Sequence, residues 1–339
     1  MGGQAENLRI ATWQIALSRE GPGLLQRDLM RGEDRQIAAA TQVLIALDAD
    51  IILLTDVDFD HGLVALNSFA DQLASAGLSY STRFALAPNT GVATGFDLDG
   101  NGRLGEARDA MGYGRFAGDG GMAILSRLPI SPDGVQDMSA FLWRDLPGAM
   151  LPPDMPPEVA QIQRLSTTGH WAVPFAVHDT TLTLLAFHAT PPVFDGPEDR
   201  NGRRNHDEAA FWLHFLAAEL PFAPPNGPFV LAGDANLDPA DGDGQPAALN
   251  ALLTHPMLQD PAPRGTSARV DTDQAGDAAT DTALFDPPLG GLRLDYLLPS
   301  AGLTVTAAGV LWPKDDDPLA ASLAAASRHR PVWVDVTLP

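Results

Sequence analysis

Polar residues that could support acid–base and metal chemistry recur in this sequence directly after short apolar runs, which are typical of buried strands. In chain order they are Gln14, Asp56, His188, Asp234 and Asn236. Strands that each end in a polar residue can bring those residues to one edge of a sheet, where binding sites commonly form. We therefore expect these side chains to lie together. An Asx turn that simply ends a strand would also explain Asp234 and Asn236.

A histidine and an aspartate near the C-terminus form a second candidate pair. His329 precedes the last apolar run of the chain, and Asp295 lies between Leu294 and Tyr296 within an earlier run. A charged side chain in a buried strand needs a partner, and an aspartate beside a histidine fixes the imidazole tautomer for acid–base work. The alternative is a structural ion pair between Asp295 and an arginine.

Clustered arginines are candidates for holding a phosphoryl group. Arg200, Arg203 and Arg204 stand close together in an otherwise acidic chain, and guanidinium groups bind phosphate through paired hydrogen bonds. We take Arg204 as a substrate-binding candidate, although nearby Asp and Glu side chains could pair with these arginines instead. His170 begins an apolar run and is a weaker candidate for the same role.

One loop has the first half of a calcium-binding pattern. Asp97, Asp99 and Asn101 occupy its first, third and fifth positions, and Gly102 occupies the sixth. These oxygen-bearing side chains suit Ca²⁺. The twelfth position is Arg108 instead of the usual glutamate, so a turn-rich loop without an ion is an equally good interpretation.

Composition limits the possible partners. The chain has 339 residues, a formal net charge of −22 and a single lysine. A field of that sign repels phosphate polyanions at long range and attracts cations, which argues against long nucleic acid as a substrate. The absence of cysteine excludes disulfide and thiolate chemistry. The sequence also lacks the run of about 18 apolar residues that a membrane-spanning helix requires.

The elements that must position these residues can be read from hydrophobic patterns. Strands are expected at residues 8–13, 51–54, 121–125, 171–177, 182–188, 229–232, 292–298 and 330–337. Helices are expected at 34–47, 61–76, 206–220 and 247–253. Loop insertions are expected near 88–121, 131–168 and 260–290. Because site residues occur from Gln14 to His329, we expect one domain over residues 8–339, preceded by a stub at 1–7.

The order of motifs resembles the endonuclease/exonuclease/phosphatase superfamily, the deoxyribonuclease-I-like metal-dependent phosphoesterases. The resemblance rests on Gly-Asp-x-Asn at 233–236, Asp-Tyr at 295–296 and Ser-x-His-x-Pro at 327–331. The stretch 190–208 is similar to a bacterial branch of that superfamily. This resemblance implies an α+β fold, a four-layer α/β/β/α sandwich in which two mixed β-sheets pack face to face between helices.

The resemblance also implies catalytic roles. His188 would contact the scissile phosphate. Asp234 would orient or activate the attacking water, and Asn236 would hold a phosphate oxygen. Asp295 would support His329, the acid–base or charge-stabilising imidazole. Mg²⁺ or Mn²⁺ would act as Lewis acid and template.

Three positions on the metal side depart from the family pattern. Gln14 stands where the family has asparagine, Asp56 where it has glutamate, and Arg328 where it has aspartate. Gln14 and Asp56 can offset each other, since one arm is longer and the other shorter. A guanidinium near the ion would weaken metal binding unless Arg328 turns away or takes over part of the ion's role on the phosphate.

We therefore expect a divalent-metal-dependent phosphoesterase that hydrolyses a small or exposed phosphoester by in-line attack of water. The alternative is a non-catalytic relative that binds a phosphorylated ligand or cation in the same place. The intact residues favour the enzyme, namely His188, Asp234, Asn236, Asp295 and His329. The departures from the family pattern favour the alternative, namely Gln14, Asp56 and Arg328. Many members of the branch are exported, so we expect a periplasmic or extracellular location; the sequence leaves a cytoplasmic one open.

Overall fold

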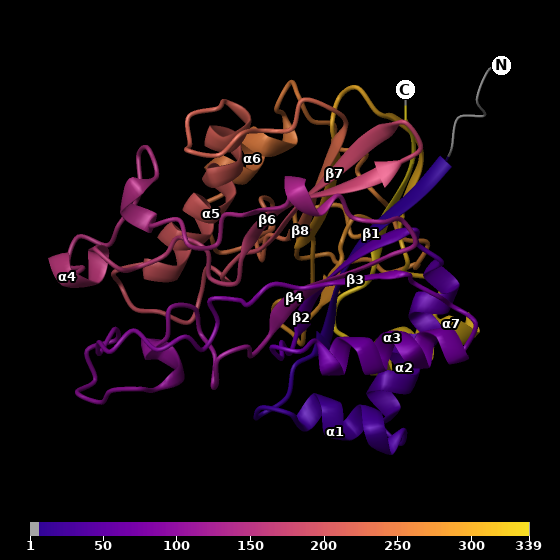
Figure 1. Ribbon diagram of the computed structural model, residues 1–339, viewed down its shortest axis with the longest axis horizontal. Coiled ribbons are helices and arrows are strands. Elements are labelled where there is room, and N and C mark those ends of the chain that lie inside the picture. The colour runs from indigo at the N-terminus through magenta and orange to yellow at the C-terminus, as the bar shows by residue number, and fades with distance from the viewer. Residues whose placement is uncertain (1–6, 339) are drawn as a thin grey trace.

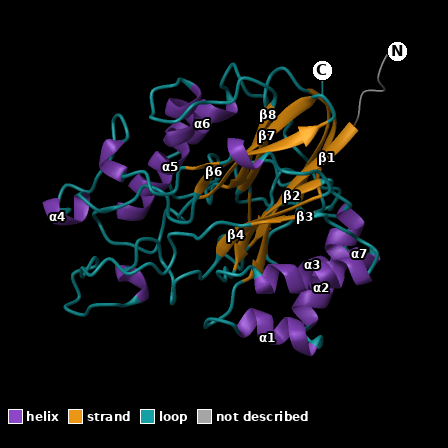
Figure 2. Ribbon diagram, viewed as in Figure 1, coloured by secondary structure: helices purple, strands orange, loops and turns teal. Residues whose placement is uncertain are grey.

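The computed structural model describes residues 7–338. The expected stub at 1–7 therefore lies outside the described residues, except for Asn7, which begins the first strand. Two β-sheets pack face to face with helices on the outer side of each (Figure 1). Figure 2 shows the long loops that extend from this sandwich on the side opposite the N-terminal helices. The expected four-layer α/β/β/α sandwich is confirmed.

The first sheet has six strands and mixed directions. Their order is β12 (Thr304–Val310), β13 (Val332–Thr337), β1 (Asn7–Leu17), β2 (Ile51–Val57), β4 (Gly121–Ser126) and β3 (Thr82–Phe84). Strand β1 runs parallel to β2 and antiparallel to β13, so the two ends of the chain meet at the centre of this sheet.

The second sheet has five strands. Their order is β11 (Asp295–Pro299), β8 (Phe229–Asp234), β7 (Thr180–His188), β6 (His170–Val177) and β5 (Gln136–Asp137). Strands β7 and β8 are parallel, and the other pairs are antiparallel. A separate two-stranded hairpin consists of β9 (Ala283–Leu284) and β10 (Gly291–Leu292).

Helices fall into two groups, one on each sheet. The first sheet carries α1 (Leu24–Arg31), α2 (Arg35–Leu47), α3 (Val64–Ser75) and α7 (Pro318–Ala326), and the second carries α5 (Arg200–Leu216) and α6 (Ala247–Leu253). The insertions contain α4 (Pro157–Ala160) and the 3₁₀ turns η1 (Ala107–Asp109), η2 (Pro132–Gly134) and η3 (Trp143–Asp145).

Strand alternation separates the apolar layers. On β2, Leu53 packs between the sheets whereas Leu54 packs against the helices. On β7, Leu184 faces the first sheet and Leu185 faces α5 and α6. Successive side chains of a strand point to opposite faces, so strands covered on both sides are apolar throughout. The inner faces of both sheets therefore continue, at their ends, into the polar residues of the candidate site.

The structure corrects several expected boundaries. Helix α5 begins at Arg200 and not at residue 206, because side chains of its polar first turns bind carbonyl groups of neighbouring loops. The expected strand 292–298 is two elements, since Leu292 pairs with Ala283 while Asp295 pairs with Asp234. Elements α1, α7 and β12 were not anticipated from the sequence.

Candidate active site

Three of the expected residues lie side by side on the second sheet. Asp234 is the register partner of His188 on β7 and of Asp295 on β11. Residues opposite one another in neighbouring strands project from the same face. That face is the inner one, because Ala186, Ala232 and Leu297, each two residues away on its strand, pack between the sheets.

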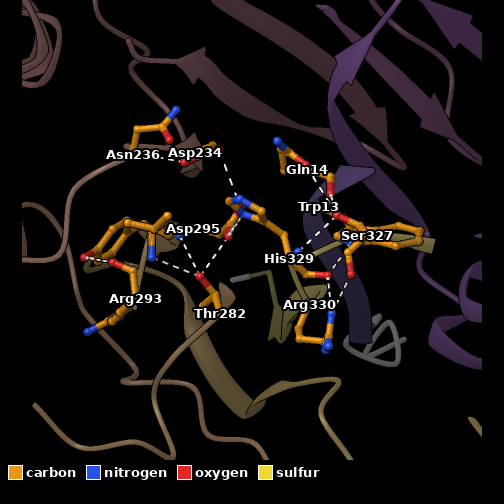
Figure 3. A network of polar contacts seen from close by, with 12 residues as sticks. Trp13, Gln14, Asp234, Asn236, Thr282, Arg293, Asp295, Ser327, His329 and Arg330 are labelled. Carbon is orange, nitrogen blue, oxygen red and sulfur yellow. Dashed lines mark hydrogen bonds and ion pairs between the residues drawn. The ribbon is translucent and has the colours of Figure 1, made fainter. Parts of the chain in front are cut away.

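His329 reaches this group from the first sheet, where it lies just before β13 (Figure 3). Its backbone carbonyl accepts a hydrogen bond from Trp13 Nε1 at 3.1 Å, and the Ser327 hydroxyl donates to Gln14 O at 2.7 Å. The Nδ1 atom of His329 lies 2.8 Å from Asp295 Oδ2. The expected Asp295–His329 pair is therefore present, and it joins the two sheets across the site edge.

The Asp234 carboxylate is fully buried and incompletely paired. Its Oδ1 accepts from the backbone N–H of Asn236 at 2.7 Å, but Oδ2 has no hydrogen-bond partner among the described residues. Oδ2 lies 3.6 Å from His188 Nε2 and 4.0 Å from His329 Nδ1. Burial, and then the charge of Asp295, raise the pKa of Asp234 well above its ordinary range.

The two histidines have opposite pKa shifts. Burial lowers the pKa of His188 to about 3, and the charge of His329 adds to this effect. Burial would also lower the pKa of His329, but Asp295, together with Asp234 and Asp56, raises it to about 9. At neutral pH the site therefore contains a neutral imidazole at His188 and a cationic one at His329, which suits different roles.

Backbone irregularity redirects the residues at two strand ends. Asp56 has a φ of 58° and Asn236 a φ of 50°, conformations that non-glycine residues adopt chiefly where surrounding structure enforces them. Strict alternation from Leu53 would point Asp56 toward the helices. The pairing of β2 with β4 shifts between Thr55 and Val57, and the Asp56 charge acts on both His329 and Asp234.

The donor set fits a divalent cation of the kind that the family pattern implies. Carboxylate oxygens of Asp234 and Asp295 lie within 4.8 Å of each other, and the imidazolium of His329 beside them has no lone pair to give to an ion. Asp234 Oδ2 and Asp295 Oδ1 are buried oxygens without hydrogen-bond partners, as expected for carboxylates that await a hard cation. On the first sheet Gln14 is the register partner of Thr55, the residue before Asp56, so both expected metal-side residues lie on neighbouring strands, with Gln14 three residues before the end of β1.

Arg328 does not join this group. Its side chain is 66% exposed and lies 3.7 Å from the exposed carboxylate of Asp286. Its guanidinium carbon is 5.9 Å from the centre of the Phe285 ring. The expected substrate-binding role of Arg328 is therefore not supported by its placement, and its charge is turned away from the metal side.

Replacement of Arg328 should accordingly have little effect. Exposed ion pairs contribute about 0–1 kcal/mol, so we expect Arg328→Ala to change the melting temperature by no more than about 2 °C and the turnover number by less than about threefold. Parallel thermal melts and kinetics on the best substrate would check this. A tenfold loss of turnover would show that the guanidinium reaches the substrate.

His170 and Arg204 are structural residues, contrary to the expectation that they bind substrate. His170 is fully buried, packs 4.6 Å from the centre of the Phe211 ring, and bonds Ser166 Oγ and Glu208 O. Arg204 is 5% exposed. It donates to the carbonyl groups of Met111, Arg164, Leu165 and Ser166. Both side chains hold the insertion loops against α5, and the Nε and Nη2 groups of Arg204 are taken up by carbonyl groups of those loops.

The expected calcium loop is only partly assembled. Carboxylate oxygens of Asp97, Asp99 and Asp109 lie within 4.8 Å of one another, but the Asn101 side chain is held in hydrogen bonds of the turn. The Asn101 amide instead donates to Asp99 and Glu106, and its oxygen accepts from Arg103 N. The turn is therefore satisfied internally. Asp109, the residue after the expected twelfth position, also closes the turn, because its oxygens accept from Leu98 N and Glu106 N.

Two residues support the site, and one of them, Thr282, was missed from the sequence. The Thr282 hydroxyl donates to Asp295 Oδ2 at 2.8 Å and accepts from the backbone N–H groups of Leu294 and Asp295. No local signal marks this threonine, which precedes β9 in a long loop. Ser327 was visible within the Ser-x-His element, and its bonds to Gln14 O and His329 N now give it a positioning role.

Comparison with known proteins identifies the family of this chain. The model of the endonuclease/exonuclease/phosphatase family matches residues 27–329, which is most of the chain. The chain therefore belongs to this family, as the order of its motifs indicated. A comparison with curated protein sequences found no match. Among the described residues no helix is long and apolar enough to cross a membrane.

Several solved structures share the fold. An endonuclease/exonuclease/phosphatase from Beutenbergia cavernae DSM 12333 is 18% identical, with 98% of this chain and 72% of that chain covered and a TM-score of 0.59. A family member from Bacteroides thetaiotaomicron is 16% identical over 99% of this chain and 100% of that chain, with a TM-score of 0.52. Sphingomyelinase C from Streptomyces griseocarneus is 17% identical over 97% and 99%, with a TM-score of 0.50. At these identities the likeness shows a common fold.

Proposed function

We propose that this protein is a divalent-metal-dependent phosphoesterase that hydrolyses a small or exposed phosphoester. The observation that carries the proposal is the Asp234 carboxylate, which is buried between His188 and the Asp295–His329 pair with one oxygen unpartnered. A carboxylate left in this state lowers stability, and its cost is understandable if the oxygen binds a water or an ion during catalysis. Family membership supports the same reaction class.

Each side chain has a role that its environment permits. Asp234 orients the attacking water and takes its proton, which a carboxyl group with a raised pKa does more readily than an ordinary one. His188, neutral and only 14% exposed, donates a hydrogen bond to a phosphoryl oxygen. Asn236 is partly exposed and binds a second phosphoryl oxygen while its Nδ2 donates to Ala189 O at 2.9 Å.

His329 acts on the side where negative charge develops. Its imidazolium, held by Asp295 at 2.8 Å, stabilises the transition state or gives its Nε2 proton to the leaving oxygen. A bound Mg²⁺ or Mn²⁺ would supply Lewis-acid polarisation of the phosphoryl group, with Asp56 and Gln14 as the holding residues on the first sheet. The charge of −22 keeps long polyanionic substrates away.

The non-catalytic alternative keeps one specific observation in its favour. No carboxylate stands at position 328, where the family pattern has one, so the metal side lacks one acidic group that this pattern implies. A weakly held ion would leave a site that binds a phosphorylated ligand without turning it over. The two functions differ in a property that is simple to measure, namely release of alcohol from a bound phosphoester.

A substrate screen tests the proposal. We would supply p-nitrophenyl phosphate and bis-p-nitrophenyl phosphate with Mg²⁺, Mn²⁺ or Ca²⁺, and include EDTA as the blank. We expect release of nitrophenol that requires the ion and persists in Arg328→Ala. Calorimetric titration of Mn²⁺ and phosphate into the same preparations provides the second reading. Binding of both without release from either ester would establish the non-catalytic alternative.

A further inference from the structure

Helix α5 carries two buried polar side chains directly beneath the strand ends of the site. Asn205 is 1% exposed and Glu208 is 0% exposed. The two residues are three positions apart, so they lie on the same face of the helix. Neither is needed to solubilise the protein, and burial of polar groups at this depth is tolerated only where each finds specific partners.

Asn205 joins the two segments that carry His188 and Asp234. Its Nδ2 atom donates to Thr190 O and to Ala235 O, each at 2.7 Å. Thr190 follows His188 by two residues, and Ala235 directly follows Asp234. Both hydrogens of the amide are therefore used, one on each segment. A single side chain thus fixes the spacing between the end of β7 and the end of β8.

Glu208 holds one of these segments as a hydrogen-bond acceptor, whereas Asn205 holds it as a donor. Its Oε2 accepts from Thr190 N at 2.7 Å, and its Oε1 accepts from Thr167 N at 2.5 Å. Thr190 is therefore held by Glu208 through its N–H and by Asn205 through its carbonyl. The segment from His188 to Thr190 therefore has little freedom to move relative to α5. The hydrogen bond from Asn205 to Ala235 O then fixes the end of β8 relative to the same helix.

The carbonyl oxygen of the Asn205 side chain indicates that this residue does not serve stability alone. Its Oδ1 is buried and has no hydrogen-bond partner among the described residues. An unpaired buried carbonyl is unfavourable, and a smaller apolar residue would avoid it. The arrangement is understandable if the position requires two N–H donors, which asparagine supplies at this length.

We propose that Asn205 is a positioning residue that sets the 3.6 Å separation between His188 Nε2 and Asp234 Oδ2. Asn205 touches neither substrate nor the reacting atoms, and acts by tying the backbone after His188 to the backbone after Asp234. This inference rests on the proposed phosphoesterase function, because it assigns His188 and Asp234 a common task. Loss of the tie lets the two strand ends separate, and misplacement by about 1 Å can cost about 10²-fold in rate.

Asn89 provides a matched control. It is also fully buried, and its Nδ2 also bridges two carbonyl groups, Ser139 O at 2.8 Å and Ser166 O at 2.7 Å. These carbonyls belong to the 131–168 insertion and not to the segments that carry His188 and Asp234. Asn89→Ala and Asn205→Ala therefore remove the same kind of bridge, and only the second should disturb the site.

The experiment compares Asn205→Ala, Asn205→Asp and Asn89→Ala with the unaltered full chain. We expect all three to lower the melting temperature. Only the Asn205 variants should lower kcat, by about 10²-fold, with KM changed by less than about twofold. The ¹⁵N-detected imidazole signals of His188, identified by their loss in His188→Gln, should shift in the Asn205 variants and stay in place in Asn89→Ala.

The experiment distinguishes failure of the Asn205 proposal from failure of the proposed phosphoesterase function. If the unaltered protein hydrolyses no phosphoester, the His188 signals still show whether Asn205 controls the geometry. If the alanine or aspartate variant does not fold, Asn205→Ser, which keeps one donor, should show a smaller shift of the same kind. A folded Asn205 variant with unchanged kcat and unshifted His188 signals would overturn the proposal, as would equal effects in Asn89→Ala.

Discussion

Replacing Asp234 with asparagine should abolish most activity and at the same time stabilise the protein. We expect kcat to fall about 10³- to 10⁴-fold, the range observed when an essential acid–base residue is removed. The amide cannot take a proton from water, although it keeps the size of the carboxylate. The stability gain follows because Asp234 is fully buried with Oδ2 unpartnered, so the ionised form lacks compensation.

The stability difference should depend on pH. Burial raises the pKa of Asp234 far above the value of about 3.9 that an aspartate has in an unfolded chain. Such a group costs nothing below the unfolded pKa, and the folded state loses stability as the pH rises from there toward the folded pKa. In EDTA the melting temperature of Asp234→Asn should therefore match the original protein near pH 4 and exceed it increasingly toward pH 8.

Asp238 supplies the control for this prediction. It is also buried, at 5% exposure, but its oxygens accept from the N–H groups of Ala240, Asp241 and Arg293. Asp238→Asn should therefore lower the melting temperature or leave it unchanged, with kcat preserved. Retention of more than a tenth of the original kcat by Asp234→Asn would mean that another group activates the water.

The second large effect is expected at His329. His329→Ala should lower kcat about 10²- to 10⁴-fold. Because Asp295 is 1% exposed and pairs with His329 at 2.8 Å, the variant should also lose stability below pH 9. The raised pKa of His329, about 9, means that its contribution is complete below about pH 6.5 and disappears as the pH rises through 9.

Asp295→Asn distinguishes a charge role of His329 from a packing role. This change keeps a hydrogen-bond acceptor for Nδ1 and removes the charge that raises the pKa of His329. If catalysis needs the imidazolium, kcat/KM of the original protein should fall as the pH rises past 9, and the fall should begin at lower pH in Asp295→Asn. An alkaline limb at the same pH in both proteins would assign His329 a structural role.

The strand-end residues could be predicted because strand patterns are local. An apolar run that ends in one polar residue marks both the strand and the edge where it terminates, so His188 and Asp234 were placed correctly at their strand ends. Gln14 was expected after a strand at residues 8–13, but β1 continues past it to Leu17. Two features of β2 that determine where the Asp56 side chain points could not be predicted from the hydrophobic pattern. The positive φ at Asp56 and the pairing shift beside it redirect its side chain, and a sequence pattern of period two does not reveal this.

The errors at Arg204 and His170 have a common cause. Arg204 was taken as a ligand for an anion because it lies in an arginine cluster in an acidic chain, and His170 because it begins an apolar run. Their true partners are carbonyl groups far away in the sequence, such as Met111 O for Arg204 and Glu208 O for His170. Carbonyl groups of Leu98 and Leu165, which bind Arg200 and Arg204, likewise favour a helix that begins at Arg200, although a polar start without a capping side chain favours a loop. Hydrogen-bond acceptors from distant parts of the chain therefore determine both the structural roles of Arg204 and His170 and the start of α5.

The measurement that bears most directly on the central claim uses oxygen-labelled water. With the best phosphoester from the screen and the preferred ion, the protein would be allowed to turn over in H₂¹⁸O, and the products would be analysed by mass spectrometry. Attack of water on phosphorus predicts one ¹⁸O atom in the phosphoryl product and none in the alcohol, with the signal lost in Asp234→Asn. Label in the alcohol, or an equal yield from Asp234→Asn, would contradict the proposed reaction at this site.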